Sequence, residues 1–259
     1  MKTSLIRVAL LGSILSYFLL IASVHAAQEV KCGQWDTVNI TPTSNVYTTH
    51  NNVWNGGNNF QCLTVNDANG DFSVNYSIDN ASTNGAPTSY SFINKGCHWG
   101  TCTNVTSSGM PKQVGTILNV NSSWITSQPK TGIYDVSYDI WFNKTPATTG
   151  QPDGAELMIW LAYQGSVQPI GSIIASNVSI AGGFWNIWEA WNGTNYVVTY
   201  ESVKRISSVS GFDINAFIKD ATSRKYIDPT WFLIGVEGGF EIWQQGTGLM
   251  SKSFSVLVD

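Results

Sequence analysis

The sequence predicts an all-β fold, a β-sandwich or jelly roll, from three observations. Apolar and polar residues alternate with period two in several segments, most clearly in residues 134–142. Asn-Gly and Gly-Gly pairs, which suit tight turns, recur between such segments, for example at Asn55-Gly56-Gly57 and Asn192-Gly193. The chain has 259 residues and shows neither a linker nor an internal repeat. One all-β domain can reach this length, so we expect a single domain.

The N-terminus has the features of a signal peptide. Lys2 and Arg7 precede an apolar stretch over residues 8–22, and a small residue, Ala26, ends the segment. We expect cleavage after Ala26, which leaves a secreted, extracellular domain over residues 27–259. The alternative is an uncleaved membrane anchor, but the stretch is shorter than the roughly 20 residues that a spanning helix needs. No later segment is apolar enough to cross a membrane, so no membrane contact is expected after cleavage.

Four cysteines lie in the exported part of the chain, and an even number in a secreted protein predicts two disulfides. Three pairings are possible, and we favour Cys32–Cys62 with Cys97–Cys102 because each closes a local loop. A zinc site is the alternative. It would have to use His50 or His98, and the spacings fit no common zinc pattern. We therefore expect no metal.

Further strands are expected at residues 72–78, 154–163, 196–200 and 235–246. One helix is expected over residues 213–221, because four apolar residues share a face there and Asp213 can cap its N-terminus. It should pack against the back of a sheet. Charged residues make up only 12% of the chain, the net charge is −4, and no basic run occurs. A nucleic-acid partner is therefore not expected.

Strand parity places carboxyl groups and tryptophans on the same face in three segments. The sets are Glu156, Met158 and Trp160; Glu237, Glu241 and Trp243; and Asp135, Asp139 and Trp141. If these faces line one cleft, like charges and desolvation raise at least one carboxyl pKa. Indoles suit the apolar faces of sugar rings, and glycoside hydrolysis needs two carboxyl groups across the scissile bond. The alternative is that the carboxylates lie on edge strands or in turns beside unrelated tryptophans.

Glu237 and Glu241 are four residues apart, about 13 Å along a strand. Only one of them can therefore flank the same glycosidic bond of the substrate as Glu156. Parity does not choose between them.

Several motifs resemble one family. ELMIW at residues 156–160 and GFEIW at residues 239–243 resemble the two catalytic strands of glycoside hydrolase family 12, small secreted endo-β-1,4-glucanases. CGQW at 32–35 and NNVWN at 51–55 resemble its N-terminal region with the first disulfide. KGCHWGTCT at 95–103 resembles a loop of its bacterial branch with the second disulfide. The similarity extends over about residues 32–259.

The resemblance implies roles for individual residues. Glu156 matches the nucleophile, Glu241 the general acid/base, and Asp139 the carboxyl group that hydrogen-bonds and orients the nucleophile. Trp54 matches an aromatic platform for a sugar on the non-reducing side, and Met158 a methionine near the catalytic centre. The remaining residues expected to contact substrate are Asn52, Trp160, Trp243 and Glu237, although a solvated, idle Glu237 is equally compatible with the pattern.

The resemblance also implies a jelly roll of two curved antiparallel sheets with a concave cleft, retention of configuration, and no cofactor. We expect protonated Glu241, with its pKa raised mainly by the Glu156 charge and by indole. Glu156 should be kept ionised by hydrogen bonds, with protonated Asp139 donating to it. At least one of Trp185, Trp188 and Trp191 should face the cleft on the reducing side, and His98 should pack in a loop or at the cleft rim.

The sequence thus predicts a monomeric, retaining endo-β-1,4-glucanase whose partner is a β-glucan polysaccharide, either cellulose or mixed-linkage β-glucan. A xyloglucan-specific enzyme is the alternative within the class. A noncatalytic glycan-binding β-sandwich is the alternative from another class, because it would use the same tryptophans and need no carboxyl pair.

Overall fold

The structure is a computed structural model that describes residues 28–40 and 47–259. The predicted signal peptide, residues 1–26, lies outside the described residues. Within the described part of the chain, no helix is long and apolar enough to cross a membrane.

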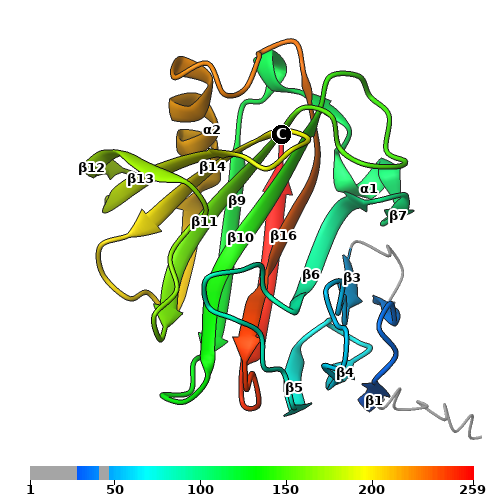
Figure 1. Ribbon diagram of the computed structural model, residues 1–259. Helices are drawn as coiled ribbons and strands as arrows, with labels where there is room; N and C mark the ends of the chain where they lie inside the picture. Colours follow the sequence, from blue (N-terminus) through cyan, green and yellow to red (C-terminus); the bar gives the residue numbers. More distant parts are fainter. Residues whose placement is uncertain (1–27, 41–46) are drawn as a thin grey trace, which may run out of the picture.

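Two sheets form the molecule, as Figure 1 shows. In the described residues, the smaller sheet has six strands in the order β1 (Gln28–Lys31), β4 (Gln61–Asn66), β5 (Phe72–Ser77), β17 (Met250–Val258), β9 (Val120–Ser127) and β15 (Ser208–Asp213). The larger sheet has the order β12 (Ser172–Ile180), β13 (Gly183–Trp191), β14 (Tyr196–Ser202), β11 (Ala155–Gln164), β10 (Ile133–Asn143), β16 (Phe232–Gln244), β6 (Ser89–His98), β3 (Tyr47–His50) and β2 (Thr37–Ile40). The short strands β7 (Thr101–Cys102) and β8 (Lys112–Gln113) pair with β6 and β16. This arrangement confirms the predicted all-β sandwich.

One pair of strands departs from the expected antiparallel pattern. β11 and β14 run parallel, with Glu156 opposite Val197 and Met158 opposite Thr199. A parallel pair needs a long connection, and β12 and β13 supply it. The consequence is that the two strands lie side by side although the hairpin β12–β13 separates them in the chain.

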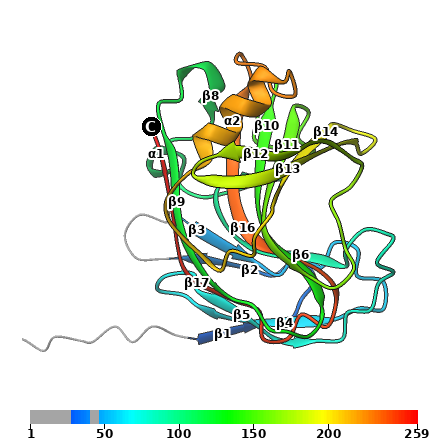
Figure 2. The ribbon, with the colours of Figure 1, turned by 90° about the vertical axis from the view of Figure 1, so that its left-hand side faces the viewer.

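The core lies between the sheets, which Figure 2 shows from the side. Each strand of the larger sheet sends alternate residues into it, for example Tyr138 and Ile140 from β10 and Phe240 from β16. Trp124 from β9 contacts Tyr138 and Phe240 edge-on or tilted, at ring-centroid distances of 5.2 and 6.0 Å. Because this face of the larger sheet is filled by apolar side chains, the polar members of the same strands lie on the other face.

The predicted helix is α2 (Ile214–Ser223). Asp213 caps it by accepting a hydrogen bond from the Ala216 backbone N–H at 3.1 Å, and its apolar residues are buried as predicted. The described residues also contain a one-turn helix, α1 (Val105–Ser108), and a 3₁₀ turn, η1 (Val114–Thr116), which the sequence pattern did not predict. Such short turns make too few contacts to leave a periodic pattern.

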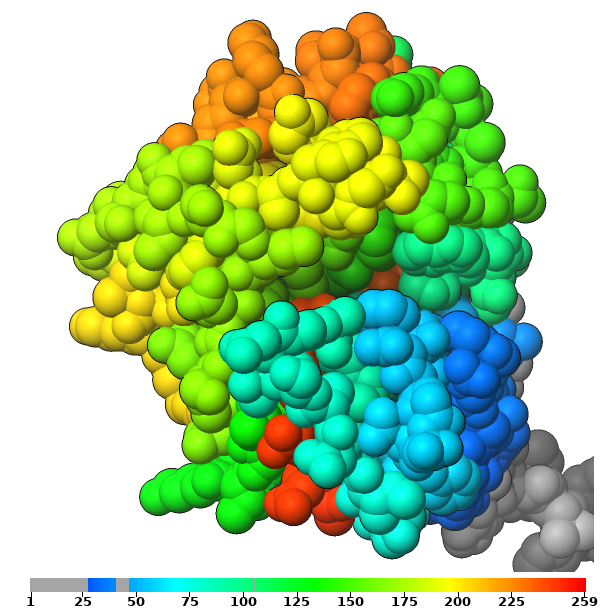
Figure 3. All heavy atoms as spheres, viewed as in Figure 1, coloured from blue at the N-terminus to red at the C-terminus, as the bar shows by residue number. Residues whose placement is uncertain are grey.

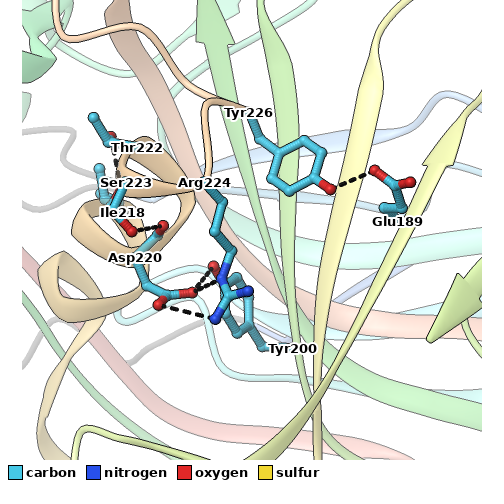
Figure 4. Close-up of polar contacts among 8 residues, drawn as sticks. All are labelled: Glu189, Tyr200, Ile218, Asp220, Thr222, Ser223, Arg224 and Tyr226. Carbon is cyan, nitrogen blue, oxygen red and sulfur yellow. Dashed lines mark hydrogen bonds and ion pairs between the residues drawn. The ribbon is translucent and has the colours of Figure 1, made fainter. Parts of the chain in front are cut away.

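Polar contacts tie α2 and the residues after it to the larger sheet (Figure 4). Asp220 accepts hydrogen bonds from Tyr200 Oη on β14 at 2.8 Å and from Arg224 Nε at 2.6 Å. Tyr226 donates to Glu189 on β13. These contacts fix β13 and β14, whose connecting loop carries Asn192 beside the site described next.

Candidate active site

The central strand of the site is β10, between β11 and β16. Asp139 on β10 lies opposite Met158 on β11 and opposite Glu237 on β16. Trp141 lies opposite Glu156 in the same way. Because the three strands are adjacent and their registers match, the carboxyl groups of the three segments do share one face, opposite the core.

Five carboxyl groups gather there, and their exposure differs. Asp135 and Glu237 have 0% of their surface exposed, and Asp139 is also buried. Glu156 and Glu241 are partly exposed. Figure 3 shows a hollow across this side of the molecule, between the blue-to-cyan region around residues 50–90 and the yellow-green region around residues 160–200. Of the five groups, Glu156 and Glu241 are therefore the ones that a molecule in the hollow can reach.

The Glu156 carboxyl group has a raised pKa, about 8. Burial is the largest cause, followed by the negative charges of Glu241 and then Glu237. Asn192 Nδ2 opposes them by donating a hydrogen bond to Glu156 Oε2 at 3.4 Å. Because the charge of Glu241 acts on Glu156, the two partly exposed carboxyl groups belong to one electrostatic site.

Glu241 has a pKa well above its ordinary value, mainly because the surrounding protein removes its carboxyl group from water, although part of the residue is exposed, and secondly because of the Asp135 charge. A side-chain hydrogen bond to Asp135 raises it further. From the sequence we expected the Glu156 charge and a neighbouring indole to raise the Glu241 pKa. In the structure the charged group that raises it is Asp135. Asp135 is one of the residues that sequence reasoning placed on this face without giving it a role.

Asp139 also has a pKa well above its ordinary value. Burial is the main cause, and the charges of Glu156, Glu237 and Glu241 follow. Asp139 Oδ1 is buried and has no hydrogen-bond partner among the described residues. Since burial and like charges both oppose ionisation, Asp139 holds a proton that it can donate to a neighbour.

Glu237 is buried, which excludes the solvated, idle carboxylate allowed by the sequence. Its Oε1 lies 2.9 Å from His98 Nδ1. Burial raises the Glu237 pKa, and His98 opposes the rise. The ring of His98 is 5.6 Å from that of His50, whose pKa is lowered to about 3 by burial and by His98. His98 is therefore a partner of Glu237, a contact that the sequence did not show.

Two of the predicted substrate-contacting tryptophans are buried. Trp160 and Trp243 pack with Met158 in a small apolar cluster, with the two indole centroids 6.3 Å apart. Trp243 Nε1 donates to Gly85 O at 2.7 Å. These side chains pack against one another and offer little free surface to a substrate. Trp54, in contrast, is 45% exposed.

Asn52 has a positive φ of 46°, a conformation that Asn tolerates. Its Nδ2 donates to Tyr90 O at 3.0 Å, and the Tyr90 backbone N–H donates to Asn52 O at 3.1 Å. Asn52 thus fixes the segment before Trp54 against β6. Its side-chain Nδ2 donates this hydrogen bond within the protein and not to a substrate.

The three tryptophans of β13 separate by parity. Trp185 is in the core, where Nε1 donates to Ile180 O at 2.9 Å. Trp191 is exposed at the strand end and contacts Tyr196. Trp188 lies opposite Thr199, whose other neighbour is Met158, so it is the member on the cleft face. Its Nε1 donates to Glu201 Oε2 at 2.9 Å.

Both predicted disulfides are present, Cys32–Cys62 and Cys97–Cys102. All four cysteines are used, so the zinc alternative has no free thiol among them. The described residues hold no group of three or more His, Cys, Asp or Glu side chains that could bind a metal ion.

A jelly roll with carboxyl groups at the bottom of an open cleft, two of them reachable and mutually repelling, is the form of a glycoside hydrolase. The family model for Glycosyl hydrolase family 12 matches residues 45–259. The chain belongs to this family, and it is a glycoside hydrolase.

Individual relatives agree. The chain is 37% identical over 150 residues to the probable cellulase Cel12b of Mycobacterium tuberculosis, covering 58% of this chain and 97% of that protein. It is 28% identical to the xyloglucan-specific endo-β-1,4-glucanase A of Aspergillus aculeatus, over 93% of this chain and 92% of that one. The structure of endoglucanase cel12A from Rhodothermus marinus matches with a TM-score of 0.83 at 38% identity, covering 89% of this chain and 99% of the other.

Proposed function

We propose that this chain is a retaining endo-β-1,4-glucanase that cleaves internal bonds of cellulose or mixed-linkage β-glucan. The observation that carries the proposal is the pair of partly exposed glutamates, Glu156 and Glu241, on the two strands that flank β10. The relatives named cellulase and endoglucanase support this substrate class. Since an open cleft accepts a chain at any point along its length, internal cleavage follows.

In the first step, Glu241 donates its proton to the glycosidic oxygen of the leaving sugar. Its raised pKa supports this role, because it keeps the proton available at neutral pH. Glu156 attacks the anomeric carbon, and a covalent glycosyl-enzyme forms. The attack requires ionised Glu156. The Glu241 charge is a cause of the high Glu156 pKa, so protonated Glu241 makes this ionisation easier.

In the second step, water attacks the anomeric carbon while Glu241 takes its proton, and Glu156 leaves as a carboxylate. We assign to protonated Asp139 the role of orienting the Glu156 carboxylate. The Glu156 charge is the strongest charge acting on Asp139, which supports their proximity. No metal or organic cofactor takes part in either step.

The remaining features of the protein follow from this activity. We propose residues 1–26 as a removable signal peptide and residues 27–259 as one catalytic domain that acts outside the cell as a monomer. Two disulfides suit an oxidising compartment. We assign to Trp54, which is 45% exposed, the stacking of a sugar ring on the non-reducing side.

A xyloglucan-specific enzyme is the second candidate, favoured by the relative of that name, which matches over 93% of this chain. Release of reducing ends from carboxymethyl cellulose, barley β-glucan and tamarind xyloglucan, measured side by side, tests both. The proposal expects the two unbranched substrates to be cleaved faster. Faster cleavage of xyloglucan would favour the second candidate.

The variant Glu156→Gln tests the assignment of the nucleophile, because it keeps the shape of the side chain and removes its charge. We expect it to lose at least about a thousand-fold in rate, on the order of 4 kcal/mol, while glucan binding persists. Wild-type activity in this variant would refute the assignment. Glucan binding without product from the wild-type protein would support the noncatalytic alternative.

A further inference from the structure

Asp135 is a buried carboxyl group that the two-step mechanism does not use. It lies on β10, on the cleft face, with 0% of its surface exposed. Its Oδ1 accepts hydrogen bonds from Ser137 Oγ at 2.8 Å and from the Glu241 backbone N–H at 3.4 Å. Its Oδ2 is buried and has no partner among the N–H and hydroxyl donors of the described residues. A buried carboxyl oxygen is costly unless another donor faces it.

The group that faces Asp135 is the carboxyl group of Glu241, with which it shares a side-chain hydrogen bond. Such a bond needs one proton for two carboxyl groups. Asp135 Oδ1 already accepts hydrogen bonds from Ser137 Oγ and from the Glu241 backbone N–H, and both bonds favour a carboxylate at this position. The proton of the pair therefore belongs to Glu241, and Asp135 is the acceptor; the directions in which the shared bond shifts the two pKa values agree with this. The backbone contact between the two residues holds the pair together across β10 and β16.

Among the residues that the structure describes, no positive charge compensates the Asp135 carboxylate. The titratable groups that interact electrostatically with Asp135 are Glu241 on β16, Asp139 on the same strand, and Tyr90 on β6. Burial raises the pKa of Tyr90 well above its ordinary value, so Tyr90 is neutral. None of the ion pairs in the described residues includes Asp135. The charge of Asp135 therefore acts directly on Glu241.

We propose that Asp135 is a positioning residue for the acid/base: its buried carboxylate accepts a hydrogen bond from Glu241, holds the proton on that residue, and aims it into the cleft until a glycosidic oxygen takes the proton. The inference rests on the proposed role of Glu241. Once Glu241 is ionised, the same negative charge strengthens it as a base for the water of the second step.

The test is the pH profile of kcat/KM for Asp135→Asn, which keeps the shape and removes the charge. Without this charge Glu241 loses its proton at lower pH, so the alkaline limb should move down by about one pH unit or more. Ser137→Ala is the matched control. It removes another hydrogen bond of Asp135 but keeps the charge, so its alkaline limb should stay within about half a unit of wild type.

A second readout separates proton donation from general damage. An aryl cellobioside with a dinitrophenolate leaving group needs no proton on departure. Asp135→Asn should therefore lose at least about ten-fold more activity on glucan than on this substrate. An unmoved alkaline limb in a folded Asp135→Asn protein, or equal losses on both substrates, would overturn the inference.

A titration of the unaltered protein covers the case in which Asp135→Asn does not fold. Carbon-13 NMR of labelled carboxyl groups, assigned with Glu241→Gln, should show Asp135 ionising before Glu241, and the reverse order would overturn the inference. Glucan hydrolysis by Glu241→Gln with a normal alkaline limb would instead refute the acid/base role of Glu241. The NMR order would still report on the pair, so the two failures are distinguishable.

Discussion

Asn192 is the side chain that donates a hydrogen bond to Glu156, and it lies in the loop between β13 and β14. The bond lowers the Glu156 pKa. In Asn192→Ala that effect is lost, the Glu156 pKa rises, and the acid limb of kcat/KM should move to higher pH by several tenths of a unit. The pH–rate profile measures it.

A second variant, Asn192→Asp, separates the effect of charge at this position from the loss of the side chain. Asn192 Oδ1 also accepts from the backbone N–H groups of Thr194 and Asn195, and aspartate keeps that acceptor. It adds a negative charge beside Glu156, so its acid limb should move further up than that of the alanine variant. Unchanged acid limbs in both variants would contradict the role of Asn192.

Strand parity correctly predicted which face each of the five carboxyl groups would occupy, because core residues alternate with them along the stretches that carry them, although the pairings of β10 with β11 and β16 contain register shifts. It did not predict which of them would be covered. Glu237 is buried because His98 comes from a neighbouring strand end, and Asp135 is buried beside Glu241. Both depend on contacts between segments about 100 or more residues apart, which a single sequence does not encode locally.

At the scale of elements, the two disulfides close loops of very different length. The cysteines of Cys32–Cys62 are 30 positions apart, and those of Cys97–Cys102 are 5 apart. Chain-entropy reasoning gives about 3.5 kcal/mol for the longer loop and about 2 kcal/mol for the shorter one. Replacing each pair by two alanines should therefore lower the free energy of unfolding more for Cys32–Cys62, as urea denaturation measures.

The shorter disulfide has a second consequence, because His98 follows Cys97 directly and contacts Glu237. Loss of this pair should raise KM for glucan, whereas loss of the longer-loop pair should leave KM near wild type. The reverse order of stabilities, or equal KM values in both variants, would contradict this account.

The helix was the element that the sequence predicted best, since its apolar face and its Asp213 cap are local signals. The parallel pairing of β11 with β14 was not predictable in this way. It is set by how the β12–β13 hairpin folds back onto the sheet, and each strand alone has the same pattern whichever direction its neighbour runs.

At the scale of the whole molecule, the raised carboxyl pKa values make stability depend on pH. Unfolded glutamate ionises near pH 4.5, whereas in the folded protein the pKa of Glu156 is raised to about 8 and that of Glu241 lies well above its ordinary value, so the two carboxyl groups together keep at least one proton in this range. Between these values the folded state binds more protons, so the free energy of unfolding falls as the pH rises. The lowered pKa of His50 acts in the other direction, but only below about pH 6.5.

Denaturation at about pH 6.5 and about pH 8.5 isolates the carboxyl contribution. The wild-type protein should be less stable at the higher pH. Glu156→Gln cannot ionise at this position, so its loss of stability over the same interval should be smaller. A loss as large as that of wild type would show that Glu156 does not contribute to the proton binding of the folded protein in this range.

The central claim is that Glu156 forms a covalent bond to the sugar. An activated 2-deoxy-2-fluoro-β-cellobioside tests it most directly, because the fluorine slows release of the glycosyl-enzyme, and mass spectrometry of peptides then locates the label. We predict one fluorinated cellobiosyl group on Glu156, and none in Glu156→Gln. A label on Glu241 or Glu237, or no label while glucan is hydrolysed with inversion, would contradict the account.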